Sequence, residues 1–166
     1  YETLVANHTI DVNGGDWAGI HWFELRRGQA DWALHQEGVF APDSQHRWMG
    51  SAAMDHMGNL AIGYSISGAS LYPSVRYAGR LSDDPLGTLP LAEKSLVEGS
   101  GSQTGSARWG DYSMLGVDPI DDCTFWYTQE YVASTGPNTW RTRIGAFRFP
   151  NCATSNMGVI KGQVTT

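Results

Sequence analysis

The sequence predicts an all-β protein built from repeated antiparallel sheets, and three observations lead to that prediction. Charged residues make up only 17% of the 166 residues, whereas there are 20 glycines and 7 tryptophans. This composition suits short strands joined by tight turns. Two stretches of the chain also resemble each other, with Trp48 matching Trp109 and Asp55 matching Asp118. A recurrence at about 60 residues, made of strand-like segments, is typical of stacked or radial β units.

A third match, between Tyr64 and Tyr127, extends the repeat into the next strand of each stretch. We therefore expect three units of about four antiparallel strands, with approximate bounds 1–42, 43–100 and 106–166. The Gly- and Ser-rich segment between the last two units is interpreted as a surface loop, because the repeat resumes directly after it.

The strands of each unit are bounded by turn signals such as Asn13-Gly14-Gly15 and Asp83-Asp84-Pro85. The first unit is expected to contribute only three strands, because the chain enters it part-way through; these are 2–12, 18–26 and 32–40. The second unit is expected to supply four strands, at 48–54, 59–65, 74–81 and 91–97. The third is expected to supply 112–117, 123–131 and 140–149, with a weaker strand at 157–164.

Units of this kind favour a partial β-propeller over the alternative, a β-sandwich. A propeller has four to eight blades of four strands, so about three units form an open arc. The end units of an arc leave a sheet face uncovered and edge strands unpaired. Such a chain is expected either to be a segment of a longer propeller or to assemble with a second copy. A sandwich of about ten strands would close without help.

Asp55 and Asp118 are both expected at the turn after the inner strand of a unit. These turns resemble the aspartate box of sialidase-type propellers, in which an Asp side chain fixes a hairpin turn. Gly58 stands one position late for that motif, and the second turn has Thr124-Phe125-Trp126 without the turn glycine. The resemblance implies a structural role for both aspartates, away from any active site.

Three longer stretches are similar to the C-terminal blades of sialidase-like propellers from large secreted bacterial proteins. The resemblance implies a propeller fold and a secreted or extracellular location, and it implies no particular chemistry. We also expect the chain to be a mature piece or a segment of a longer protein, because no signal peptide is seen. The three stretches are 46–51, 72–80 and 108–113.

The connectors between units supply the candidate ligand-binding residues. In a propeller, such connectors line one mouth of the central channel, and both connectors here end in Arg-Trp. Arginines at that mouth would hold a carboxylate or phosphate through paired hydrogen bonds. The alternative is that each Arg fixes its own loop and each Trp packs between units. The candidates are Asp43, His46, Arg47, Arg108 and Trp109, with Asp111 beside them.

Two carboxylates, Asp111 and Glu130, are the candidate catalytic residues. Glycoside hydrolysis needs a pair of carboxyl groups across the scissile bond. Sialidase-type chemistry pairs a Tyr with a Glu instead, and Tyr127 or Tyr131 lies close to Glu130 in the sequence. Neighbouring strand residues point to opposite faces, so spacing alone does not decide between these arrangements.

Several function classes are disfavoured by the composition. A net charge of −6 argues against a nucleic-acid partner, which requires dense Lys and Arg. No run of 18 apolar residues exists, so no membrane span is expected. The five histidines lack the spacing of a zinc site, and no cofactor motif is present, so neither a metal nor a cofactor is expected. Cys123 and Cys152 are either buried thiols or one disulfide.

Three functions remain after these exclusions. The first is an extracellular propeller segment that binds glycan or protein without catalysis, with exposed tryptophans such as Trp17, Trp32 or Trp140 stacking on sugar rings. The second is a sialidase-like glycoside hydrolase. The third is an architectural module that closes a ring with the remaining blades of a longer chain or with a second copy.

Overall fold

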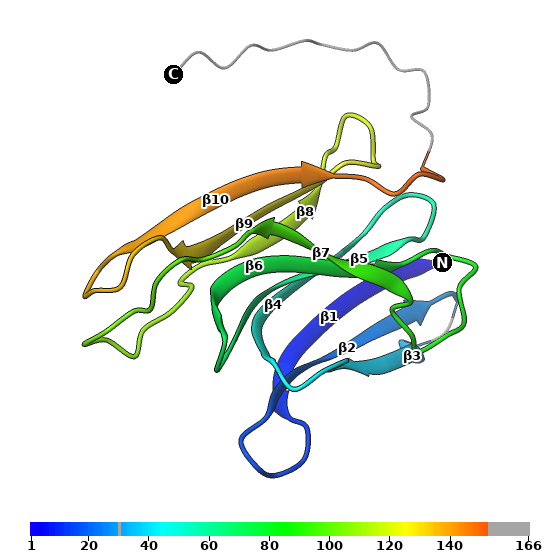
Figure 1. Cartoon of the computed structure of the whole chain (residues 1–166). Helices are drawn as coiled ribbons and strands as arrows, with labels where there is room; N and C mark the ends of the chain where they lie inside the picture. Colours follow the sequence, from blue (N-terminus) through cyan, green and yellow to red (C-terminus); the bar gives the residue numbers. More distant parts are fainter. Residues whose placement is uncertain (30, 153–166) are drawn as a thin grey trace.

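Ten strands form three antiparallel sheets in the computed structural model (Figure 1). The structure describes residues 1–29 and 31–152, and this part contains no helix. Sheet 1 consists of β1 (Glu2–Asp11), β2 (Ala18–Arg27) and β3 (Ala33–Phe40). Sheet 2 consists of β4 (His46–Met54), β5 (Leu60–Gly68), β6 (Leu71–Arg80) and β7 (Leu91–Val97). Sheet 3 consists of β8 (Met114–Val117), β9 (Phe125–Val132) and β10 (Trp140–Phe147).

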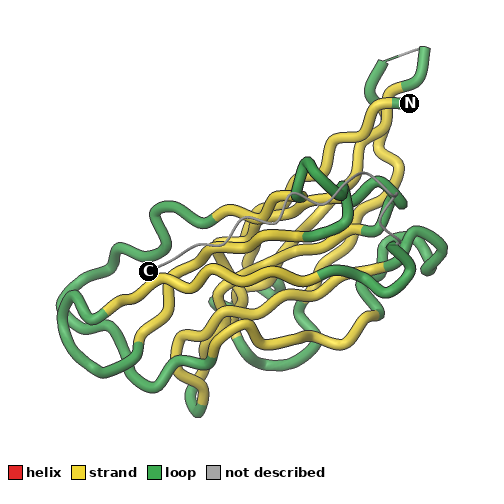
Figure 2. The backbone as a smooth tube through the Cα atoms, turned by 90° about the horizontal axis from the view of Figure 1, so that it is seen from above, coloured by secondary structure: helices red, strands yellow, loops and turns green. Residues whose placement is uncertain are grey.

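The all-β prediction is confirmed, and the strands form three separate antiparallel sheets. Within the described residues, only sheet 2 has four strands, and sheets 1 and 3 have three each. Sheet 1 has three strands as the sequence predicted. The weak strand predicted at 157–164 lies outside the described residues. Figure 2 shows the strands running along the length of the molecule, with loops gathered at its ends.

The sequence of β5 explains why sheet 2 lies in the middle. Its large residues alternate with small ones, and both sets are buried. Leu60 and Tyr64 pack with Ile20 and Trp22 of sheet 1 in one apolar core. Ala61 belongs to a second core, shared with sheet 3. Because successive side chains of a strand point to opposite faces, β5 serves two cores at once.

Strands β4 and β8 lie side by side and run in the same direction. The backbone N–H of Leu115 donates to Ser51 Oγ at 2.9 Å. In the turns that follow the two strands, the N–H of His56 donates to the carbonyl of Asp122 at 3.0 Å. Residue numbers rise together in these two contacts, so the first strands of sheets 2 and 3 are equivalent in position and direction.

One predicted match within the repeat, between Tyr64 and Tyr127, is wrong by two residues. The β4–β5 turn covers 55–59, whereas the β8–β9 turn covers 118–124 and is therefore longer by two residues. Beyond the turn, each β9 residue consequently matches a β5 residue that is 65 positions earlier rather than 63. Tyr64 thus corresponds to Gln129.

Candidate binding site

The turn aspartates hold equivalent hairpins at one end of sheets 2 and 3. Asp55 Oδ1 accepts hydrogen bonds from the backbone N–H groups of Met57 and Asn59, both at 2.9 Å. Asp118 Oδ1 accepts the N–H of Ile120 at 2.9 Å. A carboxylate that binds the backbone two residues further on stabilises a turn. Their contacts are therefore those of structural turn residues, and neither lines the candidate site described below.

Arg47 is buried in sheet 2, and its guanidinium bonds to groups of its own chain. Its Nε donates to Glu93 at 2.8 Å, and its two terminal nitrogens donate to both oxygens of Asp43 at 2.8 and 3.0 Å. Burial disfavours the charge of the guanidinium, but the hydrogen bonds to Asp43 and Glu93 outweigh it and raise the pKa of Arg47. Arg47 thus fixes its own connector, which was the alternative interpretation from the sequence.

His46 is likewise engaged within the chain. Its Nδ1 accepts the backbone N–H of Ala18 at 3.3 Å, which ties the connector to sheet 1. Asp43 is held by Arg47. Asp43, His46 and Arg47 do not line the cleft that contains Arg108 and Trp109, so the structure does not gather all the connector residues at one mouth.

The structure does bring four of the predicted residues together in one cleft: Arg108, Trp109, Asp111 and Glu130. The cleft has a volume of about 310 Å³ and opens at the end of sheet 3 where the segment before β8 meets β9 and β10. Its full lining is Gln103, Ser106, Arg108, Trp109, Gly110, Asp111, Tyr112, Gln129, Glu130, Asn138, Trp140 and Thr142.

Glu130 presents a carboxyl group that is only half satisfied. Its Oε2 accepts the backbone N–H of Gly110 at 3.0 Å. Its Oε1 is buried and has no hydrogen-bond partner within the described structure. Burial raises the pKa of Glu130, the negative charge of Asp111 adds to this, and the Gly110 hydrogen bond opposes it. Glu130 therefore lines the cleft with a carboxyl group of which one oxygen has no hydrogen-bond partner in the described structure.

The segment 108–111 places the backbone N–H of Gly110 on Glu130 and an ion pair beside it. Gly110 has a φ of 66°, in the left-handed region that glycine adopts without steric penalty. Arg108 donates to Asp111 in an ion pair, and this contact raises the pKa of Arg108. The Arg108 side chain is 83% exposed. It is therefore accessible to a bound molecule, in contrast to Arg47.

Two tryptophans give the cleft aromatic surfaces. Trp140, at the start of β10, is 52% exposed. Trp109 packs near Trp48, with ring centroids 6.0 Å apart, and its indole N–H donates to Ser65 Oγ at 2.9 Å. The sequence identified Trp140 only as one of several exposed tryptophans. It missed Gln129 and Thr142, and the strand pairing that places Thr142 opposite Glu130 would have found the second.

The corrected register explains why a cleft forms here. Glu130 of β9 occupies the position that Ser65 occupies in β5. In sheet 2 that position is covered by Trp109, which comes from the segment that leads into sheet 3. In sheet 3 the same position opens into the cleft. The position beside Glu130 is thus the equivalent of the one that the indole ring of Trp109 fills in sheet 2.

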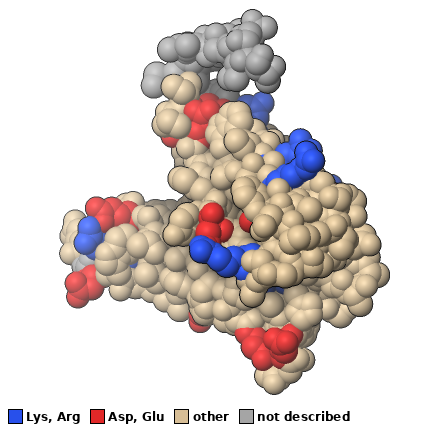
Figure 3. All heavy atoms as spheres, turned by 90° about the vertical axis from the view of Figure 1, so that its left-hand side faces the viewer, with Lys and Arg blue, Asp and Glu red and all other residues tan. Residues whose placement is uncertain are grey.

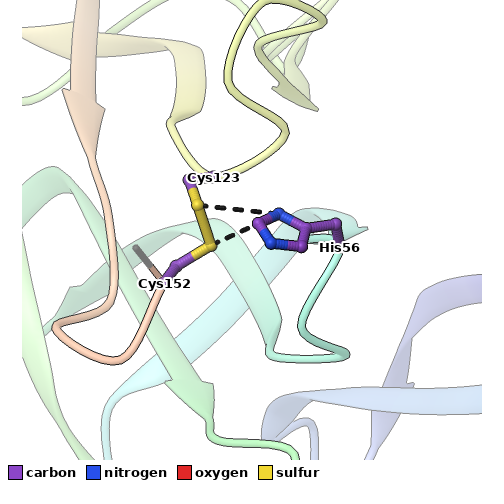
Figure 4. Close-up of side chains that lie close together, drawn as sticks. All are labelled: His56, Cys123 and Cys152. Atoms are coloured by element: carbon purple, nitrogen blue, oxygen red, sulfur yellow. Dashed lines mark hydrogen bonds between the residues drawn. A yellow bond between two sulfur atoms is a disulfide. The ribbon is translucent and has the colours of Figure 1, made fainter. Parts of the chain in front are cut away.

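Cys123 and Cys152 are joined by a disulfide that ties the β8–β9 turn to the segment after β10 (Figure 4). His56 lies against both sulfurs, with Nδ1 at 3.7 Å from each Sγ. These three side chains form a group that has the geometry to bind a metal. The sulfurs are bonded to each other, however, and metal ligation requires thiolates. We therefore assign this cluster a structural role.

Comparisons with known proteins found no matching family model, no matching curated protein and no matching solved structure. In the described part of the chain, no helix is long and apolar enough to cross a membrane. Figure 3 shows one side of the molecule, where Lys and Arg form small separate groups, some of them beside Asp and Glu, on a mostly uncharged surface. The case for a function therefore depends on the cleft and on the sheet faces.

Proposed function

We propose that the chain is an extracellular β-propeller segment that binds glycan in the cleft beside Glu130, without catalysis. The observation that carries the proposal is the buried, unpartnered Oε1 of Glu130 in a cleft that also contains Trp109 and Trp140. Sugar rings present hydroxyl donors at their edges and C–H groups on their faces. Carboxylate acceptors and aromatic rings recognise these two features, respectively.

The propeller assignment and the secreted location belong to the same proposal. Sheets 2 and 3 share an apolar core and their first strands run in the same direction, which supports a propeller arc of the sialidase-like type. The Cys123–Cys152 disulfide supports an oxidising compartment, since such bonds persist mainly outside the cytosol.

Isothermal titration against a panel of neutral and acidic oligosaccharides tests the proposal. We expect binding by the wild type, an affinity about tenfold lower for Trp140→Ala, and a further loss for Glu130→Gln. Trp32→Ala is the matched control, because Trp32 is a 40% exposed tryptophan outside the cleft. Equal effects of the two tryptophan variants would exclude the cleft as the binding site.

A glycoside hydrolase is the second candidate, because the cleft holds two carboxyl groups in unlike environments. Asp111 is paired with Arg108, whereas burial raises the pKa of Glu130. An acid with a raised pKa beside an ionised carboxylate is the pattern of glycosidases. Turnover of fluorogenic glycosides that is lost in both Asp111→Asn and Glu130→Gln, with folding intact, would favour the enzyme. Binding without turnover across the panel would leave the non-catalytic function.

A further inference from the structure

Two histidines lie opposite each other on the face of sheet 1 that points away from sheet 2. Ile20 and Trp22 of β2 belong to the apolar core between these sheets, so His21, which alternates with them, faces outward. The pairing of β1 with β2 places His8 directly across from His21. His8 Nε2 and His21 Nδ1 are 3.0 Å apart, although the two residues are 13 positions apart in the sequence. Sequence spacing therefore did not reveal this pair.

Glu37 of β3 holds the other side of the His21 ring. Its Oε2 lies 2.9 Å from His21 Nε2. An ionised carboxylate only accepts hydrogen bonds, so His21 Nε2 carries the proton, and the neutral ring presents an unprotonated Nδ1 to His8. Histidines that bind a metal ion almost always donate their second ring N–H to a carboxylate, a carbonyl or water. The contact with Glu37 thus fixes His21 in the tautomer that a metal ligand needs.

The spacing of the two nitrogens suits a single metal ion. Zn–N bonds are about 2.0–2.1 Å long, so two nitrogens of a tetrahedral ion lie about 3.3 Å apart, and the pair needs to open by only about 0.3 Å. The rings are not stacked, since their planes are 74° apart and their centroids 5.0 Å apart. His8 is exposed and the His21 side chain is 26% exposed, so an ion can reach both nitrogens from solvent.

We propose that His8 Nε2 and His21 Nδ1 bind one late first-row transition-metal ion of the class of Zn²⁺, Ni²⁺ and Cu²⁺, with Glu37 orienting His21. Imidazole nitrogen suits these ions, whereas Mg²⁺ and Ca²⁺ prefer oxygen ligands. Two protein ligands leave the remaining positions of the ion to water or to a donor atom of a bound molecule. The site lies on sheet 1, so it does not depend on the proposed glycan binding at sheet 3.

Isothermal titration of the oxidised protein with ZnCl₂ over about 1 to 1,000 µM tests the site. We expect one saturating equivalent for the wild type, and an affinity lower by about tenfold or more for His8→Ala and for His21→Ala. CaCl₂ should not compete. His35→Ala and His56→Ala are the matched controls, because His35 lies in β3 of the same sheet and His56 lies beside the disulfide. Both should bind Zn²⁺ as the wild type does. Circular dichroism checks folding, and His8→Ala changes an exposed position that sheet 1 should tolerate.

Glu37 is a positioning residue in this proposal, and two substitutions separate that role from a general effect on sheet 1. Glu37→Ala removes the acceptor for His21 Nε2–H and should weaken Zn²⁺ binding about tenfold. Glu37→Gln keeps an acceptor oxygen and should restore most of the affinity. Equal losses in the two variants would overturn the role given to Glu37.

Nitrogen NMR of the imidazole rings identifies the binding atoms. Saturation with Zn²⁺ should shift the signals of His8 Nε2 and His21 Nδ1, and His21 Nε2 should keep its proton. The site is overturned by a wild type that shows no saturable Zn²⁺ binding, or by wild-type affinity in His8→Ala. It is equally overturned if either control variant loses as much affinity as His8→Ala, or if Zn²⁺ binds His21 through Nε2.

Discussion

Ser65 of sheet 2 and Glu130 of sheet 3 occupy the same strand position but have opposite surroundings. Ser65 is fully buried and accepts the indole N–H of Trp109. Glu130 has an acceptor oxygen without a partner in the described structure and faces an open cleft. In sheet 2 this position is filled, because the segment that leads into sheet 3 places Trp109 over it. In sheet 3 no further sheet follows among the described residues, and the same position lines a cleft.

The first prediction concerns how strongly sheet 3 depends on its disulfide. Within residues 1–29 and 31–152, sheet 2 is packed on both faces and sheet 3 on one, so we expect the β8–β9 turn to rely on the bond between Cys123 and Cys152. The two cysteines are 29 residues apart. The double substitution to Ser should lower the free energy of unfolding by about 3–4 kcal/mol, by the loop-closure relation. Urea unfolding measures it.

Reduction of the wild type with a dithiol supplies the control for that variant. The reduced wild type should unfold at the same urea concentration as the double serine variant. A difference below about 1 kcal/mol between oxidised and reduced protein would contradict this account of sheet 3.

The second prediction compares the face of sheet 2 that packs on sheet 3 with the matching, more exposed face of sheet 3. A Cβ added at Gly63 would lie 2.4 Å from Cε1 of Tyr127, a contact that forces the sheets apart. Gly63→Val should therefore lower the free energy of unfolding by about 2–3 kcal/mol. Thr128→Val, at the matching position on sheet 3, should change it by less than about 0.5 kcal/mol. Similar losses in the two variants would show that sheets 2 and 3 do not share this register.

The third prediction weighs the hydrogen bond that seals sheet 2. Trp109→Phe keeps an aromatic ring over Ser65 but removes the donor to Ser65 Oγ. The free energy of unfolding should fall by about 1 kcal/mol, because a buried acceptor loses its partner. Trp32→Phe, at an exposed tryptophan, is the control and should be neutral. Thermal unfolding measures both variants. Equal losses of unfolding free energy would show that the Trp109–Ser65 hydrogen bond does not stabilise sheet 2.

The fourth and smallest effect is the pH dependence that Glu130 confers. Its pKa in the folded protein is raised, mainly by burial, so its ionised form is disfavoured on folding. Glu130 therefore reduces stability progressively as pH rises through the unfolded and then the folded pKa, and this loss is absent at lower pH. The melting temperature of Glu130→Gln should exceed that of the wild type at pH 7, and the gap should close towards pH 4. A gap that is constant with pH would contradict the assignment.

The sequence predicted the parts of the fold that depend on local patterning. Tight-turn residues and alternating apolar positions identified the all-β class, and the spacing of Asp55 and Asp118 identified two equivalent turns. The match between Tyr64 and Tyr127 failed because the second turn is longer by two residues, and only the strand pairing reveals where such an insertion lies.

The candidate site was predicted in part for a similar reason. One cleft is lined by four of the residues that the sequence predicted for a ligand site: Arg108, Trp109, Asp111 and Glu130. Arg47 looked equivalent to Arg108 in the sequence, since both precede a tryptophan. Its burial and its bond to Glu93 depend on the strand order of sheet 2, in which side chains of β4 and β7 reach each other across one face of β5 and β6. Residue spacing along the chain contains no such information.

The most direct test of the cleft follows the indole N–H signals of the seven tryptophans by nuclear magnetic resonance during an oligosaccharide titration. The account predicts that the signals of Trp140 and Trp109 shift together and saturate, while those of Trp32 and Trp126 stay in place. Saturable shifts at Trp32 or Trp126 without any at Trp140, or no shifts with any oligosaccharide of the panel, would contradict it.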